Sequence, residues 1–164
     1  MWQRTPAVLR TLLADLPPQW TAATEGPGTW SPHQVVAHLL LGDQTDWVPR
    51  VEHIMRHGDT VTFTPFSMEA HLAVAERRAL ADLLDAFAAE RVSCLGRLEA
   101  LNLTEADLAR TGRHPEFGIV TMRQHLATWL AHDLGHIAQV VRSMGRQYTD
   151  EVGPWRQYLS MLRA

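Results

Sequence analysis

Hydrophobic residues recur at intervals of three and four along most of the chain, with polar residues on the intervening faces. The pattern is most regular from Arg77 to Leu101. In that stretch, the positions that share one apolar face are Leu80, Leu83, Leu84, Phe87, Val92, Leu95 and Leu98. No internal repeat, low-complexity tract or interdomain linker interrupts the pattern. It predicts one all-α domain that spans residues 1–164.

Prolines and capping residues indicate where the first two helices begin and end. We expect the first helix over residues 6–16, because Thr5 can cap it and Pro17-Pro18 stops it. After an irregular stretch, residues 31–34 (SPHQ) form a capping box that opens the second helix. This helix runs towards residue 57. Pro49 lacks a backbone donor and should kink or divide it.

Two further helical patterns follow in the second half of the chain. The third covers roughly Met68 to Leu101. Thr121 and Gln124 form another capping box, which opens a fourth helix that continues to about Met144. Gly145 is then the expected helix stop.

A short C-terminal helix is expected from Trp155 to Leu162, after Gly153-Pro154. Four main helices of these lengths predict a four-helix bundle. The long connections, residues 58–76 and 102–120, are expected to cross the ends of that bundle.

Composition and charge exclude several classes of protein. The net charge of −3 and the absence of a Lys/Arg cluster argue against a nucleic-acid partner. No apolar run approaches the roughly 20 residues that a bilayer span needs, and the N-terminus lacks a secretory signal pattern. The single cysteine, Cys94, cannot form an internal disulfide and is expected to be buried. We therefore expect a cytoplasmic protein with no membrane partner.

Histidine is the unusual residue of this composition, with nine in 164 residues. His132 and His136 stand four residues apart on the fourth predicted helix, so both imidazoles face the same way. Such a pair can point at one metal ion but holds it loosely without a third ligand. His38 is the best candidate for that ligand, because its apolar neighbours would leave an unpartnered imidazole with a desolvation cost. We predict a divalent metal site on His38, His132 and His136.

Polar residues gather on the same helical lines as these histidines. The companions expected to orient the ligands or to line a pocket are Gln34, Gly42, His125, Trp129 and Gln139. Gly42 would leave space beside the ion, while Gln34 and Gln139 would orient ligands or substrate. His125 lies two turns before His132, too far for the same ion. Trp129, like Trp30, is expected in the core or in a pocket wall.

Other interpretations of the histidines remain open. An i, i+4 pair also occurs as two surface or packed histidines that bind no metal. The remaining histidines, which are expected at the surface, are His33, His53, His57, His71 and His114. No carboxylate is placed as a base, because Asp43 and Asp133 lie off the ligand lines of their helices.

Residues 30–39 (WSPHQVVAHL) and 132–139 (HDLGHIAQ) resemble the DinB-like (DinB/YfiT) metal-binding bundles, and the resemblance covers nearly the whole chain. It implies an up-down-down-up four-helix bundle with a long crossover connection. It also implies three histidine ligands, which match His38, His132 and His136.

The resemblance says less about activity. Some members are transferases or isomerases that use low-molecular-weight bacterial thiols, many have no assigned reaction, and the family name records induction by DNA damage. We expect one ion, Zn²⁺ or Ni²⁺, although imidazoles also suit copper and iron.

Two hypotheses about function follow from this site. The first is a metal-dependent transferase or hydrolase that acts on a small molecule or thiol. The alternative is a non-catalytic metal-binding or stress-response protein. A substrate-sized pocket beside the ion would favour the enzyme, and a sealed ion would favour the binding protein. The resemblance and the apolar long helices also predict a homodimer.

Overall fold

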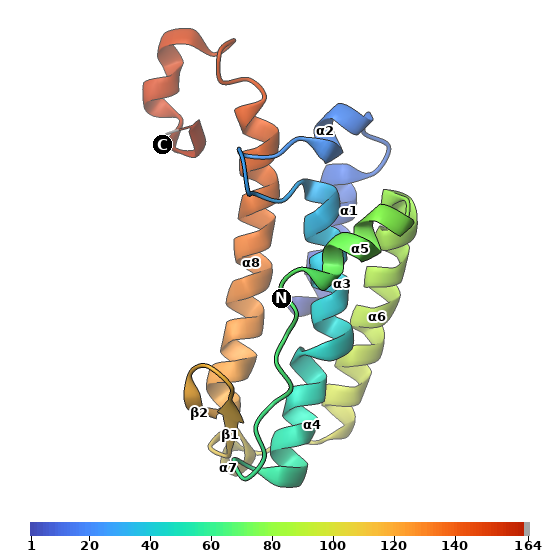
Figure 1. Ribbon diagram of the computed structural model, residues 1–164, viewed down its shortest axis with the longest axis vertical. Coiled ribbons are helices and arrows are strands. Elements are labelled where there is room, and N and C mark those ends of the chain that lie inside the picture. Colours follow the sequence, from blue (N-terminus) through green and yellow to red (C-terminus); the bar gives the residue numbers. More distant parts are fainter. Residues whose placement is uncertain (163–164) are drawn as a thin grey trace.

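The computed structural model describes residues 1–162 as an elongated bundle of helices (Figure 1). Four segments run along its length: α1 (Thr5–Leu13), α3 (Pro32–Thr45) continued by α4 (Trp47–His57), α6 (Leu80–Ala100) and α8 (Met122–Arg146). The segments α1 and α8 run upwards in Figure 1, whereas α3–α4 and α6 run downwards. The predicted up-down-down-up bundle is therefore confirmed.

Local sequence signals set the ends of the two helices that carry the predicted ligands. Both capping boxes, Ser31 with Gln34 and Thr121 with Gln124, are formed as predicted. The second helix divides between α3 and α4 at Asp46, whose φ is −117° and ψ −65°. This break lies three residues before Pro49, which cannot donate the helical hydrogen bond to the residue four positions earlier.

The N-terminal region differs from the expected single helix over residues 6–16. A 3-10 helix (Trp2–Arg4) precedes α1, and α1 ends at Leu13. Thr5 lies inside α1, where it makes no cap and its hydroxyl donates to Asp133 Oδ2 at 2.7 Å. The stretch expected to be irregular contains a further short helix, α2 (Pro18–Ala22).

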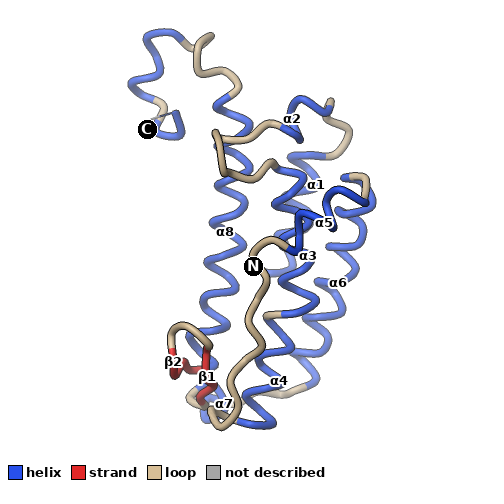
Figure 2. Tube along the Cα trace, viewed as in Figure 1, coloured by secondary structure: helices blue, strands red, loops and turns tan. Residues whose placement is uncertain are grey.

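The crossover also differs from the expected pattern. The predicted helix over residues 68–101 is split into α5 (Ala70–Arg77) and α6. Residues 58–69 run lengthwise from the lower end of α4 to α5, instead of crossing one end of the bundle (Figure 2). On α6 the expected core position Val92 is 73% exposed, and its neighbour Arg91 is buried in its place.

The connection over residues 102–120 contains structure that periodicity did not predict. It holds α7 (Glu105–Leu108) and an antiparallel hairpin of β1 (Thr111–His114) and β2 (Gly118–Thr121), in which Thr111 pairs with Thr121. Gly112 lets this hairpin pack against the crossover, because a Cβ there would lie 2.4 Å from the Phe63 ring.

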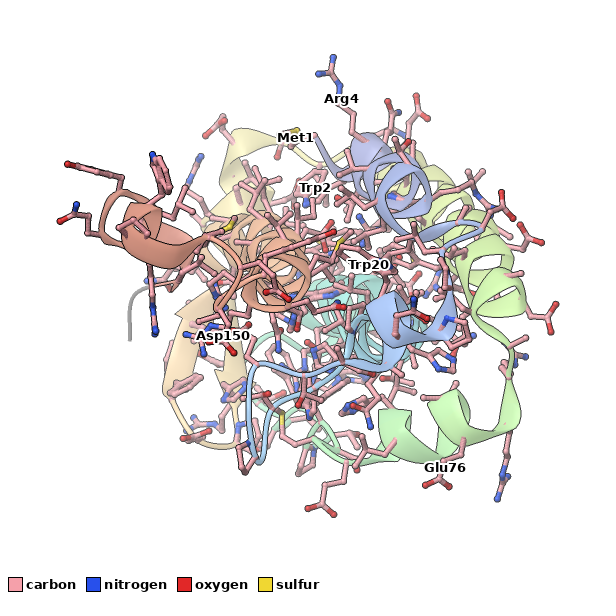
Figure 3. The ribbon with its side chains drawn as sticks, turned by 90° about the horizontal axis from the view of Figure 1, so that it is seen from above. Met1, Trp2, Arg4, Trp20, Glu76 and Asp150 are labelled. Carbon is pink, nitrogen blue, oxygen red and sulfur yellow. The ribbon has the colours of Figure 1, made fainter. Side chains whose placement is uncertain are left out.

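The C-terminal residues leave the bundle. Helix α8 continues to Arg146, past the expected stop at Gly145. The expected terminal helix is replaced by two 3-10 helices, Gly153–Tyr158 and Ser160–Leu162. Seen from above, the segment from Asp150 to Leu162 lies outside the group of long helices (Figure 3).

The core consists of two apolar clusters, one around Leu9, Val36 and Leu83, and the other around Trp47 and Trp129. Cys94 is buried in the second cluster, as predicted. None of the helices in the described part of the chain is long and apolar enough to cross a membrane.

Candidate metal centre

The capping boxes and helix packing bring the three predicted ligands to one point in the bundle. His38 comes from α3, and His132 and His136 come from successive turns of α8. The Nε2 atom of His132 lies 3.0 Å from His38 Nε2 and 3.1 Å from His136 Nε2. One ligand nitrogen from each residue lies within 4.8 Å of the others. The cluster is observed, whereas its occupation by an ion stays a prediction.

A shared divalent ion explains the spacing of these nitrogens better than hydrogen bonds among the three imidazoles do. Each neutral imidazole has a single N–H, so His132 Nε2 cannot donate to both neighbours. The Nδ1–H of His136 donates to Gln139 Oε1 at 2.9 Å, which leaves a lone pair on His136 Nε2. Nitrogen ligands of a tetrahedral zinc ion, at about 2.0–2.1 Å from the metal, lie about 3.3 Å apart. The two spacings from His132 Nε2 are close to that value.

The surroundings also favour the protonation state that binds metal. Burial, followed by the neighbouring His136 and His132, lowers the pKa of His38 from 6.5 to about 2. Burial, with a smaller contribution from His136, lowers the pKa of His132 to about 3. Burial lowers the pKa of His136 as well. All three imidazoles are therefore neutral near pH 7, which is the form that ligates an ion.

The two glutamines predicted to support the ligands have different roles. Gln139 accepts a hydrogen bond from His136, which is the contact that the predicted orienting role requires. Gln34 does not, because its Oε1 accepts from the backbone N–H of Ser31 at 2.9 Å in the capping box. In a capping box, the side chain at the third helical position bonds to the backbone of the N-cap residue. The Gln34 oxygen is therefore engaged there and does not orient a ligand.

Aromatic side chains pack against the histidines. The ring of Trp30 lies 4.7 Å from that of His38 and 6.0 Å from that of His136, measured between centroids. His71 also joins this group, 4.2 Å from Trp30, although it was expected at the surface. It is fully buried on α5. Its apolar neighbours Ala70, Leu72 and Val74 are the feature of the sequence that could have predicted this burial.

A cavity of about 660 Å³ opens onto the three histidines. It runs along α3–α4 on one side and along α8 on the other, so its lining follows both helices. The lining residues from these helices are His38, Gly42, Asp46, Trp47, Arg50, Gln124, His125, Thr128, His132 and His136. The wall is completed by residues of the crossover and of the hairpin. These are Pro65, Phe66, Met68, His114, Pro115, Glu116, Phe117 and Val120.

Gly42 and His125 line this cavity as predicted, but each has a further structural role. A Cβ on Gly42 would lie 3.0 Å from the indole Nε1 of Trp47, so the glycine makes room for that ring. His125 donates from Nε2 to the Trp47 carbonyl oxygen at 2.9 Å. Burial lowers the pKa of His125 to about 4, which keeps it neutral.

Trp129 does not reach the cavity. It is fully buried and stacks between Trp2 and Trp47, with ring centroids 5.0 and 6.0 Å away. It belongs to the core, because its position on α8 faces the N-terminal 3-10 helix.

Several polar residues of the cavity were missed from the sequence, among them Asp46, Arg50 and His114. Asp46 and Arg50 form an ion pair at the α3–α4 junction, with Arg50 Nε 2.7 Å from Asp46 Oδ1. Their i, i+4 spacing was the available signal. His114, expected at the surface, lies at the hairpin end of the cavity. Asp43 and Asp133 do lie away from the ligands, where both pair with Arg91.

Comparisons with known proteins agree with this architecture. A family model described as the DinB superfamily matches residues 1–140, which include all three histidines of the cluster. A solved structure with a TM-score of 0.74 is YfiT from Bacillus subtilis, described as a probable metal-dependent hydrolase with an unusual four-helix bundle topology. The two chains are 18% identical, and the match covers 89% of this chain and 83% of that one. No curated protein matches the sequence. At this identity the structural likeness shows the fold.

Proposed function

The chain belongs to the DinB superfamily, and from that premise we propose that it is a metal-dependent enzyme acting on a small molecule. In this proposal His38, His132 and His136 hold one divalent ion, Zn²⁺ or Ni²⁺. The reaction is a hydrolysis by water or a transfer of a low-molecular-weight thiol. The description of YfiT as a probable metal-dependent hydrolase supports the first of these reactions.

The cavity that opens onto the histidines is the observation that carries the proposal. A structural or storage site is closed by protein ligands, whereas a catalytic site has three protein ligands and keeps a position open. Here three imidazoles face a space of about 660 Å³, within the range of small-molecule pockets. The same observation disfavours the alternative of a sealed metal-binding or stress-response protein.

In this proposal the nucleophile comes from outside the protein. The only cysteine, Cys94, donates its thiol to the Asp43 carbonyl oxygen, and burial raises its pKa to about 12. Thr128 is the one hydroxyl side chain among the described residues that line the cavity. A bound divalent ion would act as a Lewis acid that lowers the pKa of a water or thiol.

The residues of the chain prepare the site for that chemistry. Burial keeps the three imidazoles neutral, and Gln139 holds His136 in the tautomer that exposes its Nε2 lone pair. Trp47 and Phe66 give the cavity apolar walls, which restrict the water around a bound substrate.

The test is metal analysis and turnover on the same samples of untagged protein. We expect one ion per chain in the wild type, loss of the ion and of turnover in His136→Ala, and neither loss in His33→Ala, which changes a histidine outside the cavity. Substrates would include activated esters and an electrophile offered with a small thiol. A chelator should abolish turnover and leave the helical circular dichroism signal largely intact, because the apolar clusters hold the bundle.

Two outcomes would contradict the proposal. Full metal content in His136→Ala would defeat the ligand assignment. A protein that retains its ion yet turns over neither class of substrate would instead be a metal-binding protein.

A further inference from the structure

The ion pair of Asp46 and Arg50 lies in the same cavity as the histidine cluster, but further along it. Asp46 is eight residues beyond His38 on the α3–α4 segment, about 12 Å along the helix at 1.5 Å per residue. The guanidinium reaches back towards the histidines, since its Nε contacts the carboxylate one turn earlier. One substrate can therefore touch the ion pair and the histidine cluster together.

Further contacts hold the side chain of Arg50, and the ion pair still has polar atoms that form no hydrogen bond within the described residues. Arg50 Nη2 donates to the Thr64 carbonyl oxygen at 3.3 Å, and the guanidinium carbon lies 5.1 Å from the Phe63 ring centroid. Among the described residues, nothing forms a hydrogen bond with Arg50 Nη1 or Asp46 Oδ2. Neither atom is among those sealed from solvent without a partner. Both are therefore available to a ligand.

The charge of this region selects the kind of ligand group. Asp46 and Arg50 together carry no net charge. Burial lowers the pKa of His125, so this side chain is neutral. Burial also lowers the pKa of His114, which lies nearby. An anionic group would be attracted by Arg50 but repelled by Asp46 and by Glu116 at the hairpin, and a cationic group would be attracted by these carboxylates but repelled by Arg50. A neutral amide avoids both costs, because it carries an acceptor and a donor side by side.

We propose that Asp46 and Arg50 form a subsite that binds a neutral amide group of the substrate. The amide carbonyl oxygen accepts from Arg50 Nη1, and the amide N–H donates to Asp46 Oδ2. The apolar part of the substrate lies against Phe66 and Phe117. This subsite rests on the proposed function in one respect only, which is that its ligand is the substrate. Neither Asp46 nor Arg50 is a proposed metal ligand.

Binding of three matched probes tests the subsite without any turnover. The probes 4-phenylbutanamide, 4-phenylbutanoate and 4-phenylbutylamine share one skeleton and differ in charge. Calorimetric titration of the full chain, metal-free and zinc-loaded, should show the amide binding about tenfold more tightly than either charged probe, as expected for hydrogen bonds to charged partners.

Two variants sharpen the test. In Asp46→Asn the accepting oxygen becomes a donating NH₂ and the pair becomes cationic, so amide binding should fall about tenfold and the carboxylate should become the preferred probe. In Arg50→Gln the amide should lose a similar factor. Arg97→Gln is the matched control, because Arg97 pairs with Glu52 outside the cavity. It should leave the ranking unchanged.

Several results would overturn the subsite. These are preference of the wild type for the carboxylate, equal binding of all three probes, no amide binding at its solubility limit, or an unchanged ranking in Asp46→Asn. The wild-type ranking stands even if a variant fails to fold. If the amide preference holds while metal binding and turnover are absent, the subsite survives and the proposed function does not.

Discussion

At the scale of single residues, Gln139 matters because it decides which nitrogen of His136 carries the proton. Without its acceptor oxygen, the His136 ring can take either tautomer and turn away from the cluster. We expect Gln139→Leu to weaken zinc binding by about 10- to 100-fold, the usual effect of removing a partner of a ligating histidine. A zinc-chelator competition measures this. Gln44→Leu, on the exposed face of α3, should have no effect, and equal affinities for all three proteins would contradict the role.

The lowered histidine pKa values predict how the metal-free protein responds to acid. In the unfolded chain His38, His132 and His125 take up protons near pH 6.5, but in the folded chain their pKa values are about 2, 3 and 4. The contribution of these neutral histidines to the stability of the fold is therefore fully present above pH 6.5, and it is lost as the pH falls below that value. Below pH 6.5, each of these histidines should lower the free energy of unfolding by about 1.4 kcal/mol per pH unit, until the pH reaches its pKa in the folded chain.

Urea unfolding of the metal-free protein at pH 7 and at pH 5 measures this loss. His125→Gln should reduce the pH dependence, because one of the contributing groups is gone. Equal free energies of unfolding at the two pH values would show that these imidazoles are not neutral in the folded chain.

At the scale of elements, a buried ion triad joins the two ligand helices through α6. Arg91 Nε lies 2.7 Å from Asp43 Oδ2 on α3, and its Nη2 lies 3.1 Å from Asp133 Oδ1 on α8. All three side chains are almost completely buried. Asp43 follows His38 by five residues and Asp133 adjoins His132. The triad therefore sets the spacing of the helices that carry the histidines.

Arg91→Met should destabilise the fold by about 3–5 kcal/mol, because it leaves two carboxylates buried without their partner. Urea unfolding measures the change. Burial already raises the pKa of Asp43 to about 6, against the pull of Arg91. The control Arg97→Met breaks a half-buried pair and should cost about 1 kcal/mol or less. Similar losses in the two variants would argue against the triad as a brace.

Elements with their own local signals were predictable from the sequence. The capping boxes at Ser31 and Thr121 and the break before Pro49 need only neighbouring residues, so they could be predicted. The hairpin is too short to show periodicity, and it depends on the contact of Gly112 with Phe63, 49 positions away in the sequence. Contacts of that kind cannot be inferred from one segment.

The candidate site shows the same limit. The three histidines were predicted from an i, i+4 pair and from the resemblance. Arg91 was not, because hydrophobic periodicity favoured Val92 for the buried position. The core accepts Arg91 only because two aspartates on other helices meet it there. Likewise, the burial of His71 depends on the packing of α5 against Trp30.

At the scale of the whole molecule, the C-terminal segment is the clearest candidate for assembly. It lies beyond the residues matched by the family model and exposes several large apolar side chains. These are Tyr148, Trp155, Tyr158 and Leu159. Four large apolar side chains exposed within one short segment favour an interaction surface there. We expect a homodimer in sedimentation at tens of micromolar.

Replacing Trp155 and Tyr158 with serine should shift the protein to a monomer if this segment makes the contact. A dimer that persists in the double variant would place the contact on the bundle faces instead. A wild-type monomer at that concentration would contradict the expected homodimer altogether.

The up-down-down-up order also has a consequence for when the proposed ion could bind in the cell. His38 and His132 are 94 positions apart in the sequence, and the crossover and α6 lie between them. Because chains are made from the N-terminus, a growing chain on the ribosome holds only a third of the cluster until α8 emerges. An ion held by all three histidines, as proposed, would therefore load after synthesis of the ligand helices is complete. The free metal pool at that moment, rather than the nascent chain, would then decide which ion enters.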